Sequence, residues 1–282
     1  MFHRRLIALI ALASALFAAN GSVHAFDESI YPNWKGQWRR LEAGPPRYDP
    51  SKPVGLGQEA PLTEEYKALH AASIADQAAG GHGNDPTFTC VPPGMPRIMN
   101  VYDSMEIVVT PKTTHIFIQA VHDSRRIFTD GRPWPANIDP SFSGYSIAKW
   151  IDTDGDGRYD VLEVETRGFK GPRAYDATGL PLHNDNESII KERIYGDKAD
   201  PGILYDEITT IDNALTRPWT VTKKYLRTEE KQPAWREAVC SMGNVHVVIG
   251  GQNYFLSAEG LLMPARKNQE PPDLKYFKQP SR

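Results

Sequence analysis

The sequence predicts a mainly β protein, an antiparallel meander of about eight strands that closes into a barrel and carries one N-terminal helix. From residue 105 onward, short runs rich in β-branched and aromatic residues alternate with turn residues. Most connections are too short for the crossover that parallel strands require, and closure removes the edges of an open sheet. A β-sandwich is the alternative arrangement. The predicted strands are residues 105–110, 114–121, 125–129, 145–151, 160–166, 187–194, 203–211 and 219–226, with a further strand at 245–249.

The helix is predicted over residues 63–79, ahead of the strands. Thr63 is a residue type that caps helix N-termini, Glu64-Glu65 suits the first turn, and Gly80-Gly81 ends the helical pattern. The stretch before the helix is rich in Pro, Gly and aromatic residues, which suits an extended covering segment. The predicted organisation is a signal peptide at 1–25, a covering segment at 26–104 that contains the helix, a β-barrel-like domain at 105–250 and a C-terminal tail at 251–282.

The start of the chain has the pattern of a secretory signal peptide. Arg4 and Arg5 form a positive n-region, residues 6–19 are apolar, and residues 23–25 fit a cleavage site with small side chains. The protein is therefore expected to be exported, to the periplasm or the extracellular space; an uncleaved membrane anchor is the alternative. No later apolar run is long enough to span a membrane as a helix, and a formal net charge of −3 does not favour nucleic-acid binding.

Cys90 and Cys240 are the only two cysteines in the chain. An oxidising compartment favours their pairing, so the sequence predicts a disulfide. Two buried thiols, or one reactive thiol, are the alternatives. Neither cysteine has the CxxC spacing of a redox or zinc site.

Residues 152–163 match the twelve-residue calcium loop of EF-hand proteins. Oxygen donors fall at the positions that such a loop uses, and Gly157 lies at the sixth position, where the chain must turn sharply. Clustered carboxylates repel one another without a cation, so the pattern predicts Ca²⁺ as the cofactor. The predicted ligands are the side chains of Asp152, Asp154, Asp156, Asp160 and Glu163 and the backbone carbonyl of Arg158.

The loop departs from the EF-hand pattern in two respects. Tyr159 stands where EF-hands usually have an aliphatic residue, and both flanks have the composition of strands instead of helices. The segment therefore resembles the EF-hand-like loops that cap β-hairpins, with a structural role for the metal. The alternative is a solvated acidic turn, in which Asp and Gly serve the turn geometry alone.

Four residues are candidates for catalysis: His122, Asp130, Arg132 and Glu192. His122 could act as a general base, and an Arg beside a carboxylate could recognise an anionic ligand; a salt-bridged turn is the alternative for Asp130 and Arg132. Glu192 lies on the apolar stripe of its strand, where it is either a candidate acid or base, or the partner of an Arg inside the barrel. The chain has no phosphate loop, dinucleotide fingerprint or Cys/His metal cluster, which disfavours nucleotide-dependent chemistry.

Several short motifs occur in order along the chain: Gly94-Met95-Pro96-Arg97-Ile98-Met99, Arg126-Ile127-Phe128-Thr129-Asp130-Gly131-Arg132, the set Gly144, Ser146, Ile147 and Trp150, and then Glu192-Arg193 and Pro218-Trp219-Thr220. Together they resemble the motifs of a family of exported bacterial β-rich proteins. The resemblance implies export and a β fold and supplies no reaction. Relatives in that family have a plain Gly-Asp turn after the Trp, so the resemblance makes the calcium loop an insertion. Gly36-Gln37-Trp38 is similar to the first strand of lipocalins, so the predicted barrel is lipocalin-like.

The predicted function is that of an exported, calcium-binding β-barrel-like protein that binds a small, partly apolar molecule in the barrel. Two alternatives stay open: an extracytoplasmic, cofactor-independent enzyme (a hydrolase, lyase or isomerase), and a calcium-stabilised surface interaction protein. Convergence of His122, Arg132 and Glu192 in one pocket would favour the enzyme. A flat face without a cavity would favour the interaction protein.

Overall fold

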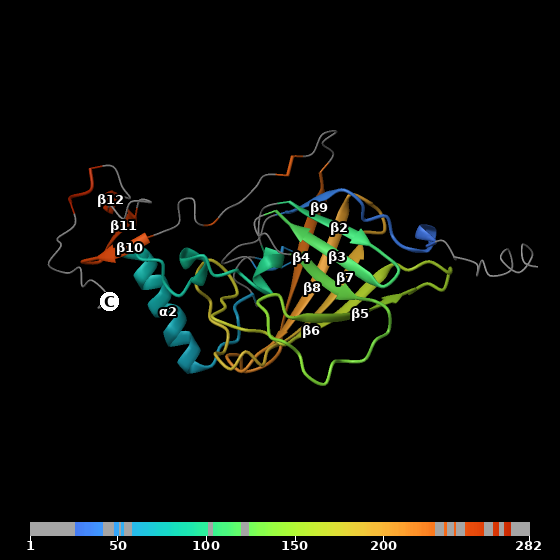
Figure 1. Ribbon diagram of the computed structural model, residues 1–282, viewed down its shortest axis with the longest axis horizontal. Helices are drawn as coiled ribbons and strands as arrows, with labels where there is room; N and C mark the ends of the chain where they lie inside the picture. Colours follow the sequence, from blue (N-terminus) through green and yellow to red (C-terminus); the bar gives the residue numbers. More distant parts are fainter. Residues whose placement is uncertain are drawn as a thin grey trace, which may run out of the picture.

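A computed structural model of the protein describes residues 26–41, 48–50, 52–53, 58–100, 104–119, 124–228, 234–235, 240, 246–256, 262–264 and 268–271. The predicted signal peptide and His122 lie outside these residues. Figure 1 shows the barrel strands on one side of the view and the helix α2 with a small C-terminal sheet on the other.

Nine strands form a closed barrel in sequence order, and β1 completes the ring by pairing with both β2 and β9 (Figure 1). The predicted mainly β, closed-barrel fold is therefore confirmed. The strands are β1 (Gln37–Arg40), β2 (Met105–Val109), β3 (Thr113–Ile118), β4 (Ser124–Phe128), β5 (Tyr145–Ile151), β6 (Val161–Arg167), β7 (Ile189–Gly196), β8 (Ile203–Ile211) and β9 (Trp219–Arg227).

The predicted antiparallel meander is confirmed for most neighbours in the barrel, and one pair is parallel. β4 and β5 run in the same direction, with Ile127 opposite Ser146 and Phe128 opposite Ile147. A ring with an odd number of strands cannot alternate direction at every step, and the nine strands here must include at least one parallel pair. The connection of residues 129–144 is long enough to carry the chain back for such a pairing.

The helix α2 (Glu64–Ala78) begins and ends where the sequence predicted. The Thr63 side chain accepts a hydrogen bond from the Tyr66 backbone N–H, at 3.5 Å, and acts as the N-cap. Tyr66 and Ser73 are the buried residues of the helix, so only a narrow face of it packs against the rest of the protein. Ahead of the helix, Leu62 forms an isolated β-bridge with Leu215.

A second, three-stranded antiparallel sheet follows the barrel. It consists of β10 (His246–Ile249), β11 (Gln252–Leu256) and β12 (Leu262–Pro264). β10 matches the strand predicted at 245–249, whereas β11 and β12 lie in the stretch expected to be a C-terminal tail. Among the described helices, none has both the length and the apolar character needed to cross a bilayer.

A disulfide joins Cys90 to Cys240, as predicted. Cys90 follows the short 3₁₀ helix η2 (Pro86–Thr89), and the two Cα atoms are 5.5 Å apart. The bridge ties the segment between β1 and β2 to the chain that follows β9.

The barrel interior is filled by side chains from alternate positions of its strands. Burial alternates along β8 and β9, as expected for strands with one face turned inward. Met95, Ile98 and Met99 belong to the same core; the last two lie in the 3₁₀ helix η3 (Arg97–Asn100), and the Tyr225 hydroxyl donates to the Met99 carbonyl at 2.9 Å. This segment therefore packs into the barrel.

Candidate metal-binding loop and buried charges of the barrel

The predicted calcium loop connects β5 and β6 as the turn of an antiparallel hairpin. Ile151 pairs with Val161 at the end of the ladder, and the Asp160 N–H donates to the Ile151 carbonyl at 3.0 Å. The Tyr159 N–H donates to the carbonyl of Ile30 at 2.7 Å, which anchors the loop to the short 3₁₀ helix η1 (Glu28–Ile30). The flanks are strands, as the composition indicated, so this is not a helix-loop-helix unit.

Three carboxylates come together in the loop. One oxygen atom from each of Asp152, Asp154 and Asp156 lies within 4.8 Å of the others. The Asp152 carboxylate accepts the N–H groups of Gly155, at 2.7 Å, and Gly157, at 2.9 Å. Gly155 and Gly157 have φ values of +76° and +86°, where other residues are strained, so these glycines let the chain fold back around Asp152. The hydrogen bond from Gly157 is the main cause that lowers the pKa of Asp152.

The other predicted ligands lie outside this group of three carboxylates. Asp160 accepts a hydrogen bond from the Thr153 N–H at 2.9 Å. Glu163 lies on β6, opposite Lys149 and Arg193, and lines an outer-surface cavity of about 580 Å³. The Arg158 N–H donates to Asp156 at 2.8 Å. The arrangement brings together the first three acidic positions of the predicted set.

An aromatic cluster lies under the loop. The Tyr159 ring is 5.2 Å from that of Tyr31 and 6.2 Å from that of Trp150. Trp34 lies 5.1 Å from Trp150, measured between ring centroids. Tyr159, the residue that departs from the EF-hand pattern, thus joins the hairpin to the N-terminal segment through ring contacts.

Asp130 and Arg132 form an ion pair within one surface turn. Arg132 donates to both carboxylate oxygens of Asp130, at 2.8 and 2.7 Å, and its guanidinium lies 3.8 Å from the centroid of the Phe128 ring. The hydrogen bonds from Arg132 lower the pKa of Asp130 to about 2. This geometry is that of the salt-bridged turn, the alternative interpretation of these two residues.

Glu192 lies inside the barrel and binds Arg125 of β4. The Arg125 guanidinium donates to the two carboxylate oxygens of Glu192 at 2.8 and 2.6 Å, and both side chains are at most 1% exposed. Such a bidentate geometry is the strongest form of this ion pair. Among the described residues, the catalytic candidates therefore have different partners: Glu192 is paired in the interior, and Asp130 with Arg132 on the surface.

Two further ionisable residues face the interior and were not singled out from the sequence. Asp206 of β8 and Lys223 of β9 are opposite each other in register, and both are buried. The Lys223 ammonium donates to the carbonyl of Tyr48 at 2.7 Å, and burial lowers the pKa of Lys223 to about 7. The alternation of inward and outward positions along the strands could have indicated that both side chains face the interior. Asp206, for example, lies on the same face of β8 as Leu204 and Ile208.

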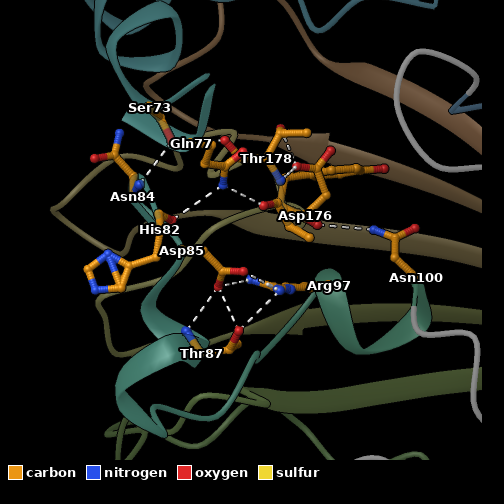
Figure 2. Close-up of polar contacts among 12 residues, drawn as sticks. Ser73, Gln77, His82, Asn84, Asp85, Thr87, Arg97, Asn100, Asp176 and Thr178 are labelled. Atoms are coloured by element: carbon orange, nitrogen blue, oxygen red, sulfur yellow. Dashed lines mark hydrogen bonds and ion pairs between the residues drawn. The ribbon is translucent and has the colours of Figure 1, made fainter. Parts of the chain in front are cut away.

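A separate polar network connects α2 to two loops (Figure 2). The Ser73 hydroxyl donates to the Thr178 carbonyl at 2.8 Å, and the Asp176 carboxylate accepts the Thr178 N–H at 2.8 Å. Nearby, Arg97, which belongs to the first of the motifs quoted for the family resemblance, donates to Asp85 at 2.8 Å. These side chains bond mainly to one another and to backbone groups, which is the pattern of a structural network.

The fold and the loop together define a closed β-barrel protein with an acidic hairpin loop that could hold a metal ion. No model of a known protein family matches the chain. No curated protein is significantly similar to it in sequence. The resemblance to a family of exported bacterial proteins therefore stays a prediction.

Proposed function

We propose that the protein is an exported β-barrel protein that binds Ca²⁺ at the loop between β5 and β6. The observation that carries the proposal is the group of three carboxylate oxygens, from Asp152, Asp154 and Asp156, within 4.8 Å of one another. Three negative charges at this spacing repel one another, and a hard divalent cation removes that repulsion. The disulfide supports export, because such bridges persist in oxidising compartments.

The donor set suits calcium in number and in chemistry. Calcium binds about six to eight oxygen atoms in flexible geometry, from carboxylates, carbonyls and water. Three aspartates and the Arg158 carbonyl supply part of that number, and Asp160 and Glu163 are the further donors in the predicted set. Extracellular calcium modules work with dissociation constants of roughly 0.1–1 mM, so weak binding suffices for an exported protein.

The role that we propose for the ion is structural. The loop closes a barrel hairpin and is attached to the N-terminal segment through Tyr159 and Ile30. Calcium would hold the turn of this hairpin in one conformation and would thereby stabilise the folded barrel by mass action.

We expect 1 mM Ca²⁺ to raise the melting temperature of the protein above its value in chelator. For a dissociation constant of about 0.1 mM, the stabilisation is about 1.4 kcal/mol, which corresponds to roughly 3–6 °C for a protein of this size. Asp152→Asn with Asp156→Asn should abolish the shift. Asparagine keeps an oxygen that can accept the turn hydrogen bonds and removes the charge that binds the ion. Thermal melts followed by circular dichroism measure the difference.

The matched control is the acidic turn between β7 and β8. Asp197 there accepts N–H groups from Ala199 and Asp200, so it resembles the loop in hydrogen bonding. Asp197→Asn with Asp200→Asn should leave the calcium shift intact. A wild-type protein that melts at the same temperature in calcium and in chelator would contradict the proposal, as would an equal shift in the Asp152/Asp156 variant.

A second candidate function is the binding of a small, partly apolar molecule. A cavity on the outer surface is a better location for such a ligand than the barrel lumen. The lumen is filled by side chains such as Trp38 and Ile116, which are at most 1% exposed. A cavity of about 410 Å³ lies between the N-terminal segment and β2, and Tyr31, Trp34 and Val108 are among its lining residues. Cavities of roughly 300–1,000 Å³ with apolar lining suit small ligands.

We expect the neutral apolar probe N-phenyl-1-naphthylamine to bind this cavity with an increase in its fluorescence. Val108→Asp should weaken binding at least fivefold, because it places a charge on the apolar wall. Val108 is 44% exposed, so the fold should tolerate the change; Val248→Asp on β10, where the side chain is 40% exposed, is the control and should leave the affinity unchanged. Equal affinity in both variants would exclude the cavity as the binding site.

A further inference from the structure

Asp206 has an unusual environment for a carboxyl group. It lies in the middle of β8 with its side chain turned inward, and it is 0% exposed. Neither of its carboxyl oxygens accepts a hydrogen bond from any donor in the described part of the chain. An ionised carboxylate can only accept hydrogen bonds, and burying one without a donor is among the costliest arrangements in a protein.

The groups that face Asp206 from the neighbouring elements are engaged elsewhere. Lys223 of β9, its partner in register, donates to the Tyr48 carbonyl, and Tyr225 of the same strand donates to the Met99 carbonyl. Arg125 of β4 binds Glu192 through two hydrogen bonds. Other charged or titratable side chains also influence this cluster electrostatically: Arg40 of β1, Tyr175, Asp49 and Asp176.

Another carboxyl group, that of Glu192 on the adjacent strand β7, is a side chain with which Asp206 can share a hydrogen bond. The two lie on the same face, since Asp206 pairs in register with Ile194, two residues from Glu192. Two carboxyl groups can form a hydrogen bond only if one of them carries a proton. Glu192 accepts both hydrogen bonds from the Arg125 guanidinium, and this pairing favours the ionised form of Glu192. The proton shared by the two carboxyl groups is therefore placed on Asp206.

We propose that Asp206 is a carboxylic acid in the folded barrel, that it donates its hydrogen to the Glu192 carboxylate, and that the barrel loses stability when this proton is released. The interior then contains a neutral acid beside a complete Arg125–Glu192 ion pair. Burial is the main cause that raises the pKa of Asp206 well above its usual range, and the Glu192 charge adds to it.

The direction of the pH dependence follows from proton counting. In the unfolded chain an aspartate loses its proton near pH 3.9, whereas folded Asp206 keeps it to higher pH. Above about pH 4 the native state therefore binds more protons than the unfolded state, and Asp206 makes stability fall as pH rises. Lys223 has the opposite effect: its pKa of about 7 in the fold, against about 10.4 in an unfolded chain, makes stability rise over that interval.

Asp206→Asn isolates the Asp206 contribution, because the amide has the same shape, can donate to Glu192 and does not titrate. We expect wild type and variant to melt within about 2 °C of each other at pH 4. As pH rises to 9, the melting temperature of the variant should increase steadily relative to that of the wild type. Lys223 is common to both proteins, so its effect largely cancels in the comparison. All melts are made in chelator, so the outcome is independent of calcium.

Asp200→Asn, in the exposed turn before β8, is the matched control and should follow the wild-type curve at every pH. Parallel curves for wild type and Asp206→Asn from pH 4 to 9 would overturn the proposal. Infrared spectroscopy of the wild type gives a test that does not depend on the variant folding. A protonated-carboxyl C=O band should be present at pH 7 and should disappear on alkaline titration, and its absence at pH 7 would also overturn the proposal.

Discussion

Arg125→Met is expected to lower the free energy of unfolding by about 3–5 kcal/mol, because it leaves Glu192 charged and without its partner inside the barrel. Arg125 and Glu192 are joined by two hydrogen bonds of 2.8 and 2.6 Å, and neither side chain reaches solvent. Methionine fills most of the same volume, so the loss reports the broken ion pair more than a cavity. Urea denaturation followed by tryptophan fluorescence measures the change.

The double variant Arg125→Met with Glu192→Leu should recover most of that loss. Replacing a buried ion pair by apolar groups of similar size is often neutral, whereas removing one partner is costly. Arg132→Met tests an ion pair on the surface, because Arg132 is bonded to Asp130 in an exposed turn. It should leave the free energy of unfolding nearly unchanged, because solvent screens an exposed ion pair. A loss below about 1 kcal/mol for Arg125→Met would refute the proposed importance of the pair.

Replacing both cysteines by serine is expected to destabilise the protein by about 2–5 kcal/mol. Cys90 and Cys240 close a loop with a sequence separation of 150 residues. On the chain-entropy argument, a loop of this length restricts the unfolded state enough to place the loss at the upper end of that interval. The free energy of unfolding of wild type and Cys90→Ser/Cys240→Ser, measured in urea without reductant, tests this expectation.

The reduced wild type and the two single variants serve as controls. Each should match the double variant in stability, because losing either thiol removes the same bridge. Intact-mass measurement of the denatured, non-reduced protein after alkylation should find no modified thiol in the wild type. Two alkylated cysteines in that experiment, or a double variant as stable as the wild type, would contradict the assignment.

Local patterns in the sequence were sufficient for most of the elements. β5 (Tyr145–Ile151) and β8 (Ile203–Ile211) have the bounds that alternation and turn residues predicted. The helix starts at the predicted cap, Thr63, because capping depends on hydrogen bonds within one turn. The aspartate spacing of the loop is likewise local, and it brings Asp152, Asp154 and Asp156 together as the pattern indicated.

The missed elements depend on partners that are distant in the chain. β1 is a strand of only four residues, Gln37–Arg40, and its two neighbours in the barrel lie far along the sequence. The parallel pairing of β4 with β5 follows from closing a ring of nine strands, which is a property of the whole barrel. The parallel pairing has no signature within a short window of sequence, and the local sign of β1 was limited to the short motif Gly36-Gln37-Trp38.

Composition and patterns among neighbouring residues are sufficient to predict the β class, the helix, the cysteine pair and the acidic loop. Which charged side chains meet depends on the three-dimensional packing of the barrel. From the sequence, Glu192 was either a candidate acid or base or the partner of an Arg inside the barrel. Closure of the barrel places it against Arg125, and the register of β7 and β8 places it on the same face as Asp206. The register of β7, β8 and β9 sets these contacts, and register is a cooperative outcome of packing the whole core.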